Sequence, residues 1–243
     1  MKLAAENVFL RSEGMLHKTK GIVLSYFRYK ETSIIVKIFT RELGLKPYLV
    51  NGVRSQKSKS KIALYQPMTL LDLVVYNKEN SGLQRISEAK LAKAQQLTPF
   101  DFNRTGLALF MTEIVSRSIF ENYQNEHLFD FLSMSILVLD QKDTSLKHFP
   151  LVFLMEQAKY LGFAPDSASG FLMENRGQPF SPEEYLIVKE FLEQLMQYSY
   201  HCDTQVTLAI RRKLIDHLLE FYSQQLESNA TWKSMSILRQ LMS

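Results

Sequence analysis

The sequence predicts an α+β protein with two domains, a small N-terminal β-barrel and an all-helical C-terminal domain. Three observations support this prediction. The hydrophobic period is close to two between Lys20 and Lys90 and changes to about 3.6 beyond Pro99. The first region contains five short strand-like segments with no helix-length interruption, and the net charge changes sign where the period changes. We therefore place the domain boundary between residues 97 and 98.

The charge of the chain is divided unequally between the two predicted domains. Residues 15–97 contain fifteen Lys and Arg against five Asp and Glu, whereas residues 98–243 contain twelve against eighteen. The net charges are therefore +10 and −6, and residues 1–14 are neutral. A basic domain joined to an acidic one indicates that a polyanion binds to the first. Residues 1–14 are a short extension to which we assign no function.

Five segments rich in β-branched and aromatic residues predict the strands of the barrel. They are residues 21–27, 32–40, 45–53, 69–76 and 83–89. Gly44 lies in a predicted turn, where it is free to adopt a positive φ. Five short strands suit a small closed barrel, and the oligonucleotide-binding (OB) barrel is the commonest five-stranded version. The strand count alone leaves an SH3-like barrel open.

The second domain begins with three amphipathic segments that predict helices over residues 103–122, 126–140 and 149–161. A further helix is predicted to start after Ser181, which forms a capping box with Glu184. Asp203 is predicted to cap the next helix, and a short last helix follows near Trp232. Residues 164–180 contain Gly, Ser, Asn and Pro and are expected to form an irregular insertion.

Several classes of protein are excluded by composition and spacing. The single cysteine, Cys202, excludes an intrachain disulfide and a multi-cysteine zinc site. No apolar run approaches the ~20 residues of a membrane span. The five histidines are scattered, and no glycine-rich phosphate-binding motif is present. We therefore expect a cytoplasmic protein that is not an enzyme and uses neither a metal nor another cofactor.

A basic run between the third and fourth strands is the strongest candidate for a binding site. It contains Arg54, Lys57, Lys59 and Lys61 within eight residues and no acid. Phosphates are its natural partners, because each neutralised phosphate releases condensed counterions. The alternative is a solvated loop, but the run lies in a +10 domain, which favours nucleic acid. The other basic candidates of this domain are Lys18, Lys20, Arg28, Lys30, Lys37, Arg41 and Lys46.

Aromatic residues lie between these charges, and an exposed ring can stack on a base for about 1–3 kcal/mol. Strand alternation places Tyr26 and Phe27 on opposite faces, so at least one of them is expected to pack in the core. For any single aromatic here, including Tyr48, the core is the first expectation. Tyr29 lies just beyond the predicted strand, between two basic residues, and is the best stacking candidate.

The acidic domain contains one basic cluster, Arg211, Arg212 and Lys213. On a helix these three residues point in different directions, so they cannot all contact one partner. One or two of them are candidates for contact with DNA, with an acidic partner tail or with the barrel. Ordinary surface ion pairs are an equal alternative.

Ten short segments occur in a fixed order along the chain. They are KGIVL (20–24), YKETS (29–33), FTRELG (39–44), VNGVRS (50–55), LYQP (64–67), EIVSR (113–117), FLME (153–156), LGF (161–163), RRKL (211–214) and KSMSIL (233–238). This ordered set resembles the RecO family of recombinational repair proteins, and the resemblance extends from Met15 to Leu238.

The resemblance implies an N-terminal OB barrel followed by a helical domain. It also implies binding of single- and double-stranded DNA, annealing of complementary strands, and loading of RecA onto strands coated by single-strand-binding protein (SSB). RecR and the acidic C-terminal tail of SSB are the implied partners, RecA is contacted indirectly, and association with the nucleoid follows. Some members have a four-cysteine zinc site, but residues 164–180 contain no cysteine.

Two other functions remain open from the residues alone. The first is an OB-type protein whose ligand is structured RNA. The second is a protein–protein adaptor whose basic face meets an acidic protein. Competition between single-stranded DNA and hairpin RNA distinguishes the first, and a failure to bind any oligonucleotide at low salt favours the second.

Overall fold

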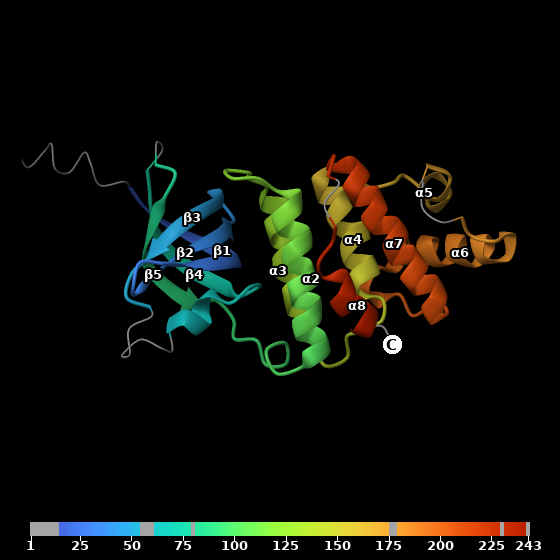
Figure 1. The fold of residues 1–243 in the computed structure, drawn as a ribbon, viewed down its shortest axis with the longest axis horizontal. Helices are drawn as coiled ribbons and strands as arrows, with labels where there is room; N and C mark the ends of the chain where they lie inside the picture. The colour runs from blue at the N-terminus through green and yellow to red at the C-terminus, as the bar shows by residue number, and fades with distance from the viewer. Residues whose placement is uncertain (1–14, 54–60, 79–80, 175–178, 229–230, 242–243) are drawn as a thin grey trace, which may run out of the picture. The chain divides into compact units, whose positions relative to one another are not determined.

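The computed structural model describes residues 15–53, 61–78, 81–174, 179–228 and 231–241 (Figure 1). The chain divides into two compact units. The barrel unit contains the residues up to 95 together with Ile119–Ser133, and the helical unit contains Gln96–Ser118 and Met134–Ser243. Residues 119–133 thus group with the barrel, although they follow the predicted boundary in the sequence.

A closed five-stranded barrel confirms the predicted fold of the first part of the chain, with the strand order β1-β2-β3-β5-β4. The strands are β1 (Met15–Tyr29), β2 (Ser33–Thr40), β3 (Gly44–Val50), β4 (Leu70–Asn77) and β5 (Gln84–Leu91). β1 pairs with both β2 and β4, and β3 pairs with β5 in parallel. A 3₁₀ helix, η2 (Lys61–Tyr65), precedes β4 in the chain. This arrangement is consistent with an OB-type barrel.

The long strand β1 contains a β-bulge between Val23 and Ser25. Gly21 and Val23 face the barrel interior before the bulge, and Tyr26 packs against the same core after it. The extra residue therefore exchanges the inward and outward positions of β1. A Cβ on Gly21 would lie 2.6 Å from side-chain atoms of Ile38 and Leu73, which explains the glycine at this crossing.

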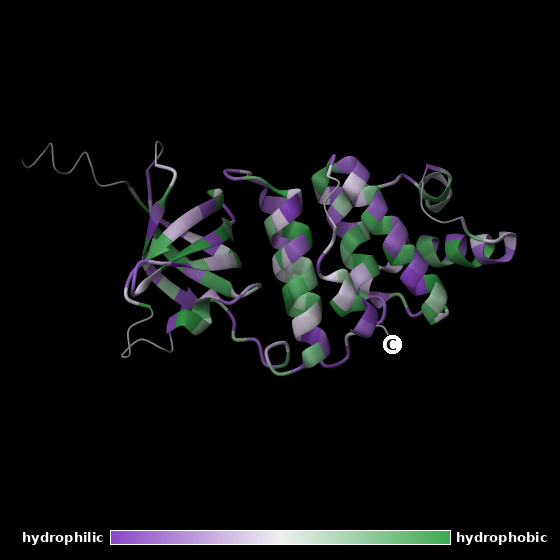
Figure 2. Cartoon of the chain, in the orientation of Figure 1, coloured by the Kyte–Doolittle hydropathy of each residue, from purple (hydrophilic) through white to green (hydrophobic). Residues whose placement is uncertain are grey.

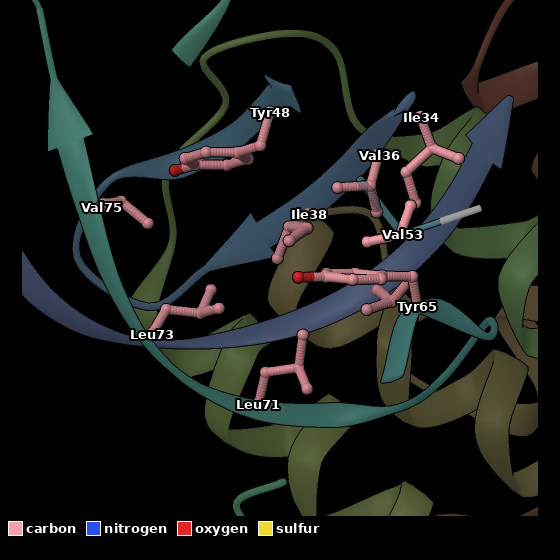
Figure 3. Close-up of a cluster of buried hydrophobic side chains, with 10 residues drawn as sticks. Ile34, Val36, Ile38, Tyr48, Val53, Tyr65, Leu71, Leu73 and Val75 are labelled. Atoms are coloured by element: carbon pink, nitrogen blue, oxygen red, sulfur yellow. The ribbon is translucent and has the colours of Figure 1, made fainter. Parts of the chain in front are cut away.

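The barrel core is a cluster of branched aliphatic side chains around two tyrosines (Figure 3). Tyr48 and Tyr65 are almost fully buried in it. Ile34, Val36 and Ile38 of β2 face this core at every second position, as their spacing predicts. The alternation that identified the strand thus also determines which of its faces is buried.

The β2–β3 turn contacts the segment that follows α2 (Phe102–Ser118). The Leu45 amide donates to the Tyr123 carbonyl at 2.9 Å, and the Asn122 amide donates to the Leu45 carbonyl at 2.8 Å. Gly44 adopts φ 73°, as predicted, and its missing Cβ leaves room for the backbone at Tyr123. The predicted helix over 103–122 therefore ends earlier, because residues 122 and 123 hydrogen-bond with the barrel.

The helical unit is built from six α-helices and part of a seventh within the described residues. α3 (Glu126–Leu139) begins in the barrel unit and ends in the helical unit. The others, after α2, are α4 (Phe149–Leu161), α5 (Ala168–Glu174), α6 (Pro182–Tyr198), α7 (Leu208–Gln225) and α8 (Met235–Leu241), with a 3₁₀ turn η3 (Ser199–His201). Residues 164–180 thus contain the short helix α5, where we expected an irregular insertion.

The helix starts show which capping predictions were correct. The Ser181–Glu184 capping box is present, with both reciprocal hydrogen bonds. The N-cap of α7 is Thr207, whose hydroxyl accepts from the Ile210 amide at 3.2 Å. The prediction of Asp203 as this cap was wrong, because residues 202–207 have no regular secondary structure and the helix begins later, at Leu208.

α4 forms the centre of the helical unit and is largely hydrophobic (Figure 2). Nine of its thirteen residues are buried, and α6 and α7 both pack against it. The fully buried Tyr222 of α7 donates its hydroxyl hydrogen to the Leu154 carbonyl at 2.7 Å, which satisfies this polar atom inside the core. None of the helices in the described part of the chain is long and apolar enough to span a bilayer.

Candidate nucleic-acid interface

Strand pairing aligns a row of residues on the outside of the barrel, two from β1 and one from each of the other four strands. These residues, which we call the outer row, are Leu16, Tyr76, Arg85, Leu49, Ile35 and Phe27, each directly opposite the next. Opposed residues on neighbouring strands point to the same side of a sheet. Phe27 and Leu16 are 50% and 54% exposed, so the row faces away from the core. An aromatic and aliphatic surface with one arginine therefore surrounds the barrel.

Two predicted site residues extend this surface. Tyr29 lies two residues beyond Phe27 on the same face of β1, and its ring centroid is 5.4 Å from the Lys30 ammonium. Lys37 is exposed two residues beyond Ile35, opposite Ser25 and Pro47. The barrel thus brings two aromatic rings and a lysine together on the outer face of β1 and β2.

The other aromatic residues lie where the alternation predicts. Tyr26 packs against the core while Phe27 is half-exposed, so the prediction that they occupy opposite faces is confirmed. Tyr48 is fully buried, and this burial raises the pKa of its hydroxyl to about 12. Tyr48 is therefore unable to stack on a base.

The remaining basic candidates of the barrel are spread over its surface. Lys18 and Lys20 are exposed on the outer face of the first half of β1, where Lys20 forms an ion pair with Asp72 at 3.1 Å. The Lys46 ammonium donates to the Asn77 side-chain oxygen at 2.7 Å. Three more are exposed, Arg28 at the end of β1, Lys30 in the following turn and Lys61 at the start of η2. These cations raise the positive potential over the barrel surface as a whole and do not form one compact binding site.

Arg41 is held by carboxylates. It donates two hydrogen bonds to Asp130, at 2.8 and 2.9 Å, and forms an ion pair with Glu126 at 2.7 Å. The hydrogen bond to Asp130 is the main reason that the pKa of Arg41 is raised. Arg41 therefore links the β2–β3 turn to the first turns of α3, and its charge is largely neutralised within the barrel unit.

Three of the four basic residues in the predicted binding loop, Arg54, Lys57 and Lys59, lie outside the described residues. The chain enters this segment from the buried Val53 and leaves it at the exposed Lys61. Their assignment to DNA binding stays a prediction.

The three basic residues of the helical unit, Arg211, Arg212 and Lys213, differ in their burial and in their partners. Arg211 is only 9% exposed, whereas Arg212 donates to the Arg239 carbonyl at 2.8 Å and Lys213 forms an ion pair with Glu184 at 2.9 Å. Burial lowers the pKa of Arg211, and the charge of Arg212 lowers it further. Within the described residues, no carboxylate pairs with the Arg211 guanidinium.

His148, which directly precedes α4, lies near this arginine. Its side chain is 4% exposed, and its pKa is lowered mainly by burial and also by the charges of Arg211 and Lys147. Three basic groups thus gather where α4 begins, and a helix N-terminus itself favours an anion. No group of three or more metal-binding side chains is found in the described parts of the chain.

Several residues of this interface were not predicted from the sequence. Phe27, Ile35, Leu49 and Arg85 were either unassigned or treated as strand residues. The bulge in β1 decides that Phe27, and not Tyr26, faces outward. Arg85 joins the row through the parallel pairing of β5 with β3, which depends on the closed barrel. Alternation along β1 indicates that one of Tyr26 and Phe27 faces outward, but not which one. It contains no information on the pairing of β5 with β3.

Comparison with known proteins agrees with this architecture. The family model "Recombination protein O N terminal" matches residues 15–95, and "Recombination protein O C terminal" matches residues 99–235. The DNA repair protein RecO of Flavobacterium psychrophilum is 34% identical over 236 residues, covering 93% of this chain and 99% of the relative. The RecO protein of Phocaeicola vulgatus is 35% identical over 246 residues, covering 94% and 100%. The chain therefore belongs to the RecO family of DNA repair proteins.

Proposed function

We propose that this protein is a non-catalytic DNA-binding factor that anneals complementary strands and, with RecR, helps load RecA onto SSB-coated single-stranded DNA. The observation that supports DNA binding most directly is the outer face of β1 and β2. There the exposed ring of Phe27 and the partly buried ring of Tyr29 lie on the same face as the positive charge of Lys37. This combination suits single strands, because rings stack on bases of any sequence and cations neutralise the backbone.

Annealing follows from charge neutralisation. Two DNA strands repel each other through their phosphates, and residues 15–97, with a net charge of +10, lower this repulsion when both strands lie on them. Bases that stack on Phe27 and Tyr29 no longer stack on one another, so their pairing edges stay open to the complementary strand. The reaction needs no bond to be made or broken in the DNA, so neither a nucleophile nor ATP is required.

The helical unit would provide the protein contacts. Its net negative charge discourages DNA from binding there, so DNA remains on the barrel. As its docking place for the acidic, apolar C-terminal tail of SSB we propose the start of α4, where the exposed Lys147 lies beside the buried His148 and Arg211. An Arg211→Gln variant should bind an SSB tail peptide more weakly, whereas Arg212→Gln, whose guanidinium already bonds with a carbonyl, should bind it normally.

The decisive experiment is annealing of two complementary labelled oligonucleotides coated with SSB. Rapid pairing without ATP, lost at high salt, is expected for the wild-type protein. Phe27→Ala should slow pairing and weaken binding to single strands by about five-fold or more. Lys90→Gln serves as a control, because Lys90 is an exposed cation of β5 outside the outer row.

The same assay separates the rival functions. Binding without faster pairing would retain the DNA-binding barrel and remove annealing from the proposal. Preference for hairpin RNA over single-stranded DNA at equal salt would favour an RNA-binding protein. Absence of binding to any oligonucleotide at low salt would favour a protein–protein adaptor.

A further inference from the structure

A cavity of about 380 Å³ lies beside the loop between β4 and β5. The described residues that line it are Tyr76, Lys78, Ser81, Leu83, Gln84 and Arg85. This volume falls at the lower end of the range that small-molecule sites occupy, about 300–1,000 Å³. The cavity is therefore large enough for one nucleotide.

The buried Gln84 side chain holds two described residues of the loop, Lys78 and Ser81, in position. Gln84 is 3% exposed, and its side-chain oxygen accepts from the Lys78 amide at 2.9 Å. Its side-chain nitrogen donates to the carbonyls of Lys78 and Ser81, at 2.9 and 2.7 Å. The Gln84 side chain thus fixes Lys78 and Ser81, two of the residues that line the cavity, without help from a ligand.

The cavity is continuous with the proposed DNA surface. Tyr76 and Arg85 are directly opposite each other, and both belong to the outer row. Arg85 is in turn opposite Leu49, from which the row continues to Phe27. A strand that crosses the outer face of β1, β2 and β3 would therefore reach the cavity at β5.

The lining has the chemistry of a nucleotide site. Tyr76 offers an aromatic ring and Leu83 an apolar side chain that is 36% exposed. Lys78 and Arg85 are both exposed, and neither forms an ion pair with another described residue. A ring beside two available cations can hold a base and the phosphate attached to it.

We propose that this cavity binds one unpaired nucleotide of the strand on the barrel, with its base against Tyr76 and its phosphate at Lys78 and Arg85. The inference rests on the proposed DNA-binding function. A paired base within a duplex cannot enter, because it stays stacked between its neighbours. The cavity thus makes the protein favour single strands over duplex.

The test is a binding titration of the full chain with oligo(dT) and with the same oligonucleotide as a duplex. Tyr76→Leu should weaken single-strand binding by about five- to 150-fold, the range of one lost base stack, and leave duplex binding unchanged. Tyr76→Phe, which retains the ring, should bind like the wild type. Arg85→Gln should also weaken single-strand binding, whereas Lys90→Gln should not.

A fluorescent base supplies a second readout that a loss of stability would not imitate. The fluorescence of a single 2-aminopurine in the strand should be quenched when this base stacks on Tyr76. Tyr76→Phe should retain this quenching, and Tyr76→Leu should abolish it. Equal weakening of single-strand and duplex binding by Tyr76→Leu, or no weakening of either, would overturn the inference while DNA binding by the wild type stands. Wild-type protein that binds neither form would overturn the proposed function and the inference with it.

Discussion

Arg41 and Asp130 are joined by two parallel hydrogen bonds, from Nε to Oδ1 at 2.8 Å and from the guanidinium NH2 to Oδ2 at 2.9 Å. Arg41 lies in the β2–β3 turn, and Asp130 lies on α3, far along the chain. Phe39 packs against Phe129 beside this pair, with ring centroids 5.9 Å apart. A polar and an aromatic contact together attach residues 119–133 to the barrel, which explains why this segment belongs to the barrel unit.

The Arg41–Asp130 pair should make stability depend on pH in the acid range. The hydrogen bond from Arg41 is the main cause of the lowered pKa of Asp130. A carboxyl whose folded pKa is lowered stabilises the fold above its unfolded pKa, about 3.9, and this stabilisation is lost as pH falls through the folded value. Asp130→Asn should therefore flatten the decrease in unfolding free energy below about pH 4.

Urea unfolding at a series of pH values measures this effect. Asp143→Asn is the matched control, since Asp143 is an exposed carboxyl in the loop after α3. A double-mutant cycle with Arg41→Ala should give a non-zero coupling at neutral pH that disappears in strong acid. Equal acid sensitivity of wild type and Asp130→Asn would show that the pair contributes nothing.

Gly44 and Gly52 allow backbone strain to be separated from steric clash. Both have positive φ, 73° and 71°. A Cβ at Gly44 would collide with the Tyr123 carbonyl oxygen, whereas a Cβ at Gly52 would meet no atom of the described residues within 4 Å. Gly52→Ala should therefore cost only about 1 kcal/mol for the unfavourable φ, and Gly44→Ala should cost roughly 2 kcal/mol more. Thermal and urea unfolding of the two variants would test this order, and equal losses would contradict it.

Glu113 connects α2 to the segment before α8. Its carboxylate accepts hydrogen bonds from the amides of Lys233 and Ser234, at 2.9 and 2.7 Å, and from the Ser234 hydroxyl at 2.6 Å. Burial opposes ionisation of Glu113, but these hydrogen bonds outweigh it and lower the pKa. Glu113→Ala should destabilise the fold by about 1–3 kcal/mol, because two backbone amides lose a charged acceptor.

Hydrogen exchange offers the local measurement for Glu113. The amides of Lys233 and Ser234 should exchange faster in Glu113→Ala while those of the barrel strands keep their protection. Glu190→Ala, at an exposed position of α6, serves as the control for loss of a surface carboxylate. Unchanged exchange at residues 233 and 234 would argue against this connection.

The basic loop remains the strongest prediction that rests on sequence alone. Reversal of Arg54, Lys57, Lys59 and Lys61 to Glu should weaken binding to every DNA sequence and reduce the slope of log affinity against log salt. Titrations at several salt concentrations measure both quantities. Binding equal to wild type would remove the loop from the interface and leave the outer face of the barrel as the sole candidate.

The sequence determined the fold class because its signals are local. Alternation in β2 identified a strand and its buried face, and the 3.6 period identified α4. The Ser181–Glu184 capping box was predicted correctly because both partners lie within one turn. The charge division between the two parts of the chain is likewise a property of composition.

Only the tertiary structure decided how individual residues are used. Arg41 resembles any other lysine or arginine of the basic domain until α3 brings Asp130 beside it. Phe27 becomes an exposed ring because a bulge shifts the register of β1 by one residue, a change that alternation cannot locate. Arg85 and Tyr76 reach the same surface as Phe27 through pairing across a closed barrel. Such contacts join residues far apart in sequence, and no local pattern encodes them.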